Sequence, residues 1–231
     1  MNTRTWTGPL ESGDFPDQLR ARVITPGAEP HVHGYDVERD LAHHYRFTDL
    51  MFLLLTGELP KSEALAGLEV ALCFFSPVSV AHASTHASVL SRLCGASTSS
   101  TIGVSATALA EQARVTLAEH DELLRWNPAA SEPLPARYVA SDDAELASVR
   151  RLQAALAKTG LVVPGLDQRP TRNAALLLVL RACGLKRKEQ MELVLVLARL
   201  PAALSEAFAE RATNFANYPI NLPAFSYEEP A

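Results

Sequence analysis

The feature that most restricts the fold of this chain is the helical spacing of its apolar residues, which recurs along most of the sequence without a convincing alternating strand. Segments 65–75 and 142–158 place apolar residues three and four positions apart, a spacing that forms one face of a helix. Helix-ending residues follow such segments, as at Gly57 and Pro77. The pattern therefore predicts an all-α protein.

Helices are expected at the following residues: 36–45, 48–56, 62–75, 82–93, 96–113, 142–158, 173–183, 188–199 and 201–211. Segment 48–56 is apolar on nearly every side, so we expect it to lie in a core. Segment 96–113 consists largely of small residues, which favour a tightly packed central helix or an interface. The apolar residues that recur on one side of it are Ile102, Val104, Ala106 and Leu109. Residues 127–135 form the clearest expected loop.

Composition excludes several classes of protein. The 231 residues are 48% hydrophobic and 20% charged, as in soluble globular proteins, and the net charge of −5 disfavours general binding to nucleic acid or an anionic membrane. The longest purely apolar run, 174–180, is much shorter than the roughly 20 residues of a membrane helix. The N-terminal residues show no apolar stretch typical of a signal peptide, so we expect a cytoplasmic protein.

Neither the cysteines nor the histidines have the spacing of a metal site, and no metal or cofactor is expected. Cys73, Cys94 and Cys183 are far apart in apolar helical contexts, which predicts reduced core thiols. His82 and His86 are four residues apart, but no third ligand accompanies them. The histidines considered as replacement acid or base groups are His31, His33, His43, His44, His82, His86 and His120.

Two neighbouring segments resemble the citrate synthase superfamily: His33-Gly-Tyr-Asp-Val-Glu-Arg-Asp-Leu-Ala42 and Phe47-Thr-Asp-Leu-Met-Phe-Leu-Leu-Leu-Thr-Gly-Glu-Leu-Pro60. Weaker similarity continues at His82-Ala-Ser-Thr-His-Ala-Ser, at Val163-Pro-Gly-Leu-Asp-Gln-Arg169 and over 173–199. The proportions are closer to the short citryl-CoA lyase-like members than to full-length synthases.

The resemblance implies a helical large domain with a strongly reduced small domain. The large domain is expected at 35–126 and 171–212, and the remnant of the small domain at 127–170. Residues 1–34 are expected to form an N-terminal arm and residues 213–231 an extended C-terminal arm.

The family's reaction needs a carboxylate base, two histidines and arginines that hold the carboxylates of a 2-oxoacid. The resemblance places Arg114 near the first histidine motif and Asn173 near the catalytic aspartate, and the second histidine falls in a deletion. Arg169 and Arg199 match two carboxylate-binding arginines of the family. Their alternative role is in local ion pairs at the surface.

These observations favour a non-catalytic subunit or scaffold, a pseudoenzyme that forms a homodimer or a heteromer with an active citrate synthase-like chain. One alternative is a divergent enzyme of this class, an acyltransferase or citryl-CoA lyase-like protein acting on an acyl-CoA and a 2-oxoacid. A third hypothesis is a sensor that binds a di- or tricarboxylate or CoA. In each case a CoA thioester is at most a substrate or ligand.

Overall fold

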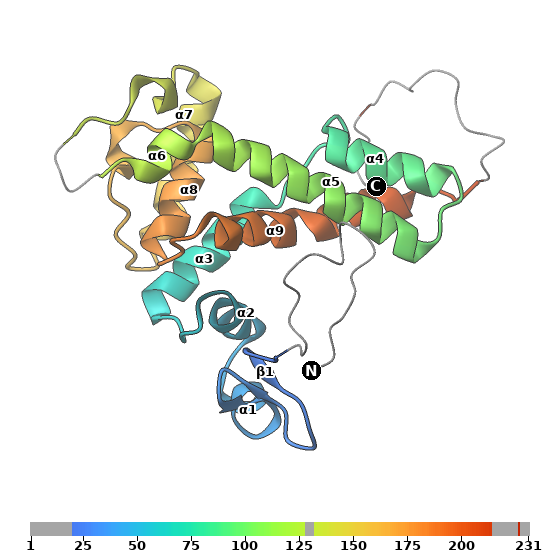
Figure 1. The fold of residues 1–231 in the computed structure, drawn as a ribbon. Coiled ribbons are helices and arrows are strands. Elements are labelled where there is room, and N and C mark those ends of the chain that lie inside the picture. The colour runs from blue at the N-terminus through green and yellow to red at the C-terminus, as the bar shows by residue number, and fades with distance from the viewer. Residues whose placement is uncertain (1–19, 128–131, 214–225, 227–231) are drawn as a thin grey trace, which may run out of the picture. The chain divides into compact units, whose positions relative to one another are not determined.

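The computed structural model describes residues 20–127, 132–213 and 226. The chain divides into two compact units, Met1–Glu58 and Leu59–Ala231, which are described separately. Residues 1–19 of the expected N-terminal arm and nearly all of the expected C-terminal arm lie outside the described residues. The described part contains nine α-helices, and none of them is long and apolar enough to cross a membrane. Figure 1 draws these helices as coiled ribbons.

The first unit contains a small sheet that the sequence did not predict. Strands β1 (Ile24–Thr25), β2 (His31–Val32) and β3 (Tyr35–Asp36) form an antiparallel sheet in the order β1-β2-β3. Residues His33 and Gly34, both with positive φ, make the tight turn between β2 and β3. Each strand has only two residues, which is too short for an alternating pattern to be visible.

The helix expected at 36–45 is present as two short pieces. A π-helical turn, η1 (Val37–Leu41), is followed by α1 (Ala42–His44). The carboxylate of Asp36 accepts hydrogen bonds from the backbone N–H groups of Glu38 and Arg39 and so caps this turn. The apolar helix expected next is α2 (Phe47–Thr56), which buries Phe52, Leu53 and Leu55 and ends at Gly57 with a φ of 81°.

The second unit is a bundle of helices around two long ones. These two are α5 (Thr98–Glu119) and α9 (Lys188–Ala209), which pack along each other and against α4 (Ala83–Leu93), as Figure 1 shows. The other helices of this unit are α3 (Ser62–Phe75), α6 (Asp121–Arg125), α7 (Asp143–Leu156) and α8 (Arg172–Ala182). Helix α3 packs against α7, α8 and α9, and this packing brings the start of α8 near the end of α3.

Helix α5 packs closely, as its small residues predicted. Of the apolar residues noted on one side of it, Leu109 is buried, whereas Ile102 and Val104 are each 40% exposed. The buried stripe repeats every fourth residue and consists of Thr101, Ser105, Leu109, Ala113 and Leu117. Its small side chains let α4 approach, with Ser105 Oγ 2.7 Å from Ser88 Oγ. Hydroxyl groups can face the core here because each one also reaches the carbonyl one turn earlier.

Helix α9 continues through Pro201, where the sequence had predicted a break between two helices. Proline removes one backbone hydrogen bond and normally kinks a helix. Here the proline lies on an exposed side, while Ala198 and Ala203 on either side of it are buried. Packing along the full length of α9 therefore outweighs the local preference of the proline.

The three cysteines are free thiols, but only one of them is a core residue. Cys183 is buried, and burial raises its pKa to about 12. Cys73 is exposed and Cys94 is half-buried, so the prediction of three core thiols was wrong for these two.

The chain before α8 is held by a tight turn against an aromatic ring. Gly165 has a φ of 83°, and a Cβ atom at this position would lie 2.5 Å from the Trp126 ring. After this turn, the short helical turn η4 (Leu166–Gln168) places Gln168 Oε1 to accept the backbone N–H of Leu134 at 2.6 Å. Thr171 then caps α8. This segment therefore fixes where α8 begins.

Candidate functional site

A small polar cavity lies where four helices of the second unit meet. The end of α3, the second half of α5, the start of α8 and the second half of α9 contribute to it, together with the residues before α4. Its volume is about 160 Å³, which corresponds to the space of about five waters. The lining residues are Phe74, Phe75, Pro77, Val78, His82, Gln112, Thr116, Arg172, Asn173, Leu176 and Arg199.

Two arginines are held in this cavity by the last carbonyl groups of α3. Arg172 Nη2 donates to the carbonyl oxygen of Phe74 at 2.7 Å, and Arg199 Nε donates to that of Phe75 at 3.3 Å. The Arg199 guanidinium also lies 5.9 Å from the centre of the Phe75 ring. These hydrogen bonds use one of the five N–H groups of each guanidinium and leave the others for a ligand.

The cavity has an uncompensated positive charge. Burial and, next, the charge of Arg172 lower the pKa of Arg199 from its ordinary value, although a guanidinium stays protonated. None of the cavity's lining residues is Asp or Glu, and neither arginine forms an ion pair within the part of the chain that the structure describes. Helices α4 and α8 begin at its edge, and helix N-termini favour anions. The arrangement can therefore bind a small anion.

Of the residues predicted from sequence, Arg199 and Asn173 line this cavity, although Asn173 is exposed. Arg169 does not line it: this residue follows η4 in a left-handed conformation, and its side chain is exposed. Arg114 is exposed on α5 and pairs with Glu111, with Nε 2.8 Å from Oε2. The structure thus brings Arg199 and Asn173 together and leaves Arg169 and Arg114 outside.

Arg172 is the candidate functional residue that the sequence did not predict. It is the first residue of α8, directly before Asn173, and its position beside Arg199 depends on the packing of α8 against α3. The sequence signal that could have found it is a cation in the first turn of a helix, where the helix dipole disfavours positive charge. His82, the residue before α4, is the only one of the seven histidines among the cavity's lining residues.

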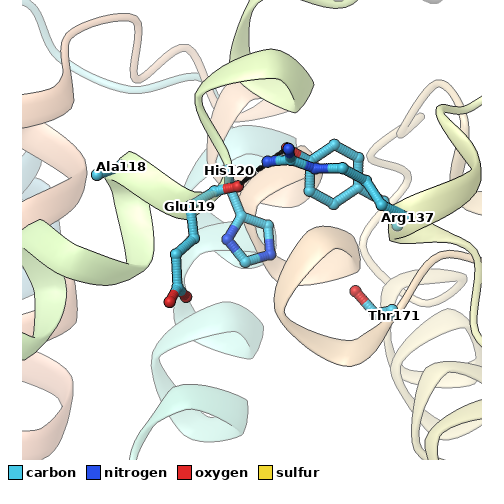
Figure 2. A pocket seen from close by; sticks show the side chains of 6 residues that line it. Ala118, Glu119, His120, Arg137 and Thr171 are labelled. Carbon is cyan, nitrogen blue, oxygen red and sulfur yellow. Dashed lines mark hydrogen bonds between the residues drawn. The ribbon is translucent and has the colours of Figure 1, made fainter.

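A second and larger cavity, of about 570 Å³, is lined by Ala118, Glu119, His120, Arg137, Tyr138 and Thr171. Figure 2 shows the Arg137 guanidinium directed toward the backbone of Glu119, to which it donates. Arg137 also approaches Glu122 at 3.5 Å and stacks over the Tyr138 ring at 4.6 Å. His120 stacks on the same ring from a centroid distance of 5.2 Å.

The cation of the second cavity is therefore compensated, whereas those of the first are not. We accordingly take the smaller cavity as the candidate site. No group of three or more metal-binding side chains occurs among the described residues.

Comparison with solved structures identifies the fold class as citrate synthase-like. The chain is similar to citryl-CoA lyase from Hydrogenobacter thermophilus, with a TM-score of 0.66 over 92% of this chain and 96% of that chain, at 14% identity. It is also similar to ATP citrate lyase from Methanothrix soehngenii in complex with citrate and coenzyme A, with a TM-score of 0.54 over 98% of this chain, at 13% identity. No protein-family model matches the sequence, and no curated protein matches it.

The resemblance seen in the sequence is confirmed at the level of the fold. The chain corresponds to 45% of ATP citrate lyase but to 96% of citryl-CoA lyase. The sequence predicted a small domain that is strongly reduced relative to full-length synthases. The citryl-CoA lyase, in contrast, is matched over nearly its whole chain. The length of this chain is therefore no argument against the fold of that lyase. The domain boundaries at 127–170 stay a prediction.

Proposed function

We propose that this chain is a non-catalytic citrate synthase-like protein that binds a small di- or tricarboxylate between Arg172 and Arg199. The observation that carries the proposal is the pair of neighbouring guanidiniums in a cavity whose described lining residues include no Asp or Glu. A planar guanidinium matches a carboxylate with two parallel hydrogen bonds, so two of them suit a ligand with two carboxylates.

The same side chains support the absence of catalysis. The condensation or cleavage implied by the family resemblance needs a carboxylate that exchanges a proton with the acyl methyl group. Where the resemblance expects that carboxylate, this chain has Asn173, and an amide is not a proton acceptor at neutral pH. The cavity thus has cationic groups that can hold an acid, but its lining residues include no carboxylate that could take the proton of the acyl methyl group.

One observation favours the alternative of a divergent enzyme of this class. His82 lines the same cavity, and an imidazole is the side chain best suited to proton transfer near neutral pH. An enzyme of this kind would release free CoA from an acyl-CoA and a 2-oxoacid, and this release would depend on His82.

The proposal is tested by calorimetric titration of the full chain with citrate, oxaloacetate and CoA, followed by an assay for free CoA. We expect micromolar to millimolar binding of the carboxylates and no release of CoA from acetyl-CoA with oxaloacetate. Absence of carboxylate binding would contradict the binding proposal. Release of CoA that disappears in His82→Ala would support the alternative enzyme.

We also propose that the chain pairs with itself or with an active citrate synthase-like chain. Val104 and Val115 are exposed apolar side chains on the same side of α5, and apolar side chains that share an exposed helix face support an interface. Light scattering should give twice the 25.0 kDa of one chain, and Val104→Asp should reduce it to the single-chain mass. A single-chain mass for the unmodified protein, together with no co-elution with a synthase-like chain, would contradict this pairing.

A further inference from the structure

We propose that Gln112, held in place by Ser84, determines which acid the cavity prefers. In this role Gln112 donates a hydrogen bond to a ligand oxygen that lies beside the two carboxylates, such as a hydroxyl or keto oxygen. The inference rests on the proposed function, because it concerns the selectivity of the Arg172/Arg199 cavity.

The amide of Gln112 has a defined orientation. Gln112 extends from α5 into the lining of the cavity, and its Oε1 accepts a hydrogen bond from Ser84 Oγ at 2.9 Å. Ser84 is only 3% exposed, at the start of α4. Its backbone carbonyl accepts a hydrogen bond from Ser88 Oγ at 2.8 Å. A buried donor on a fixed helix therefore occupies the amide oxygen.

With Oε1 occupied in this way, the amide presents its Nε2 hydrogens to the cavity. Nε2 of Gln112 forms no hydrogen bond within the described ranges 20–127 and 132–213. The neighbouring Thr116 hydroxyl gives its proton to the backbone carbonyl of Gln112 at 2.9 Å, so it does not donate to a ligand. The side-chain amide of Gln112 is therefore a neutral hydrogen-bond donor from α5, and it complements the cationic guanidiniums of Arg172 and Arg199.

This set of donors suits one chemical class of ligand. Two guanidiniums match two carboxylates, and a neutral N–H matches a neutral oxygen acceptor, which costs less to desolvate than a third charge. A short dicarboxylate with a hydroxyl or keto group satisfies all three donors. The unsubstituted acid of the same length leaves the amide without a partner in the occupied cavity, and an unmade buried hydrogen bond is costly.

The test compares L-malate with succinate by calorimetric titration, since the two acids differ by one hydroxyl group. We expect the unmodified protein to bind malate about tenfold more tightly than succinate. In Gln112→Met, which keeps the side-chain volume, this ratio should fall to about one, with the affinity for succinate nearly unchanged.

Two further variants separate this role from a merely structural one. Gln112→Glu keeps an acceptor for the Ser84 hydroxyl, so it should fold normally, yet its charge should weaken the binding of both acids by at least about 30-fold. Ser84→Ala frees the amide and should reduce the malate-to-succinate ratio without weakening succinate. Ser91→Ala, a matched change farther along α4 that removes a hydroxyl donating to the Ser88 carbonyl and not to Ser84 or Gln112, should leave the ratio unchanged.

The titrations distinguish a failure of carboxylate binding from a failure of the Gln112 role. If the unmodified protein binds neither acid, the proposed function itself is wrong and the selectivity falls with it. If the unmodified protein binds both acids without a preference, or if Gln112→Met keeps the preference for malate, the proposed role of Gln112 is wrong. The binding of carboxylates by the two arginines is still supported in either case.

Discussion

Replacing Arg199 by Met is expected to weaken the binding of small dicarboxylates by about 100-fold, equivalent to about 2.7 kcal/mol. The change removes one of the two guanidiniums and the paired hydrogen bonds that it offers, while methionine keeps much of the apolar stem. Calorimetric titration measures the loss directly. Arg199→Lys should recover only part of the affinity, because an ammonium group lacks the planar arrangement of donors.

The same substitution should barely change stability, which distinguishes a binding residue from a structural one. Arg199→Met loses the hydrogen bond to the Phe75 carbonyl, but it also removes the burial of a charge and its repulsion from Arg172, which together lower the pKa of Arg199. These effects oppose each other, so the free energy of unfolding should change by less than about 1 kcal/mol. A loss of several kcal/mol together with the loss of binding would indicate that Arg199 is a structural residue.

Two matched arginine variants serve as controls for this experiment. Arg114 already pairs with Glu111 on the exposed side of α5, so Arg114→Met should leave the affinity within about twofold. Arg169→Met tests the prediction made from sequence, because the structure places this side chain outside the cavity lining. A loss at Arg169 equal to that at Arg199 would favour the sequence prediction over the assignment of Arg172.

Replacing Gly165 by Ala is expected to lower the free energy of unfolding by about 3 kcal/mol. The left-handed backbone at this position costs an L-residue about 1–2 kcal/mol, and an added methyl 2.5 Å from the buried Trp126 ring costs a further 1–3 kcal/mol. The ring cannot move aside as the end of a flexible chain would. Urea unfolding should therefore show a lower midpoint with an unchanged slope.

Gly103 provides the matched control for Gly165. It lies within α5, where an added methyl group would have no neighbouring atom within 4 Å, so Gly103→Ala should stabilise the protein by up to about 1 kcal/mol through helix propensity. The two variants make the same chemical change with opposite expected signs. Equal effects at both positions would mean that neither the backbone conformation nor the Trp126 contact matters.

Sequence patterns were a good guide to the helices, but they missed part of the buried face of α5 and the continuity of α9. Periodicity and end signals located α3 at Ser62–Phe75 and ended α2 at Gly57, because these features depend on nearby residues. Thr101 and Ser105 on the buried face of α5 carry no apolar signal, and only the approach of α4 makes hydroxyl groups acceptable there. Pro201 was misjudged for a similar reason, since packing along α9 overrides its local effect.

The candidate site was only half predictable. The motif pointed to Arg199, which lines the cavity, and to Arg169, which does not, and it gave no sign of Arg172 three residues after Arg169. The η4 turn precedes both arginines and changes the direction of the chain. The backbone path from Gly165 onward therefore determines which of the two side chains reaches the cavity, and the local sequence does not show this path. The role of Gln112 depends on Ser84, which is 28 residues away in sequence.

The anchoring of both guanidiniums by the end of α3 has a consequence for how this protein would respond to its surroundings. The cavity keeps two like charges close together, so their repulsion lowers the stability of the folded chain, and the proposed binding of an anion would relieve it. A ligand at 100 times its dissociation constant adds about 2.7 kcal/mol to the stability of a protein that binds it only when folded. Resistance to heat or proteolysis would then rise and fall with the concentration of the acid, and the amount of folded chain would report a metabolite level.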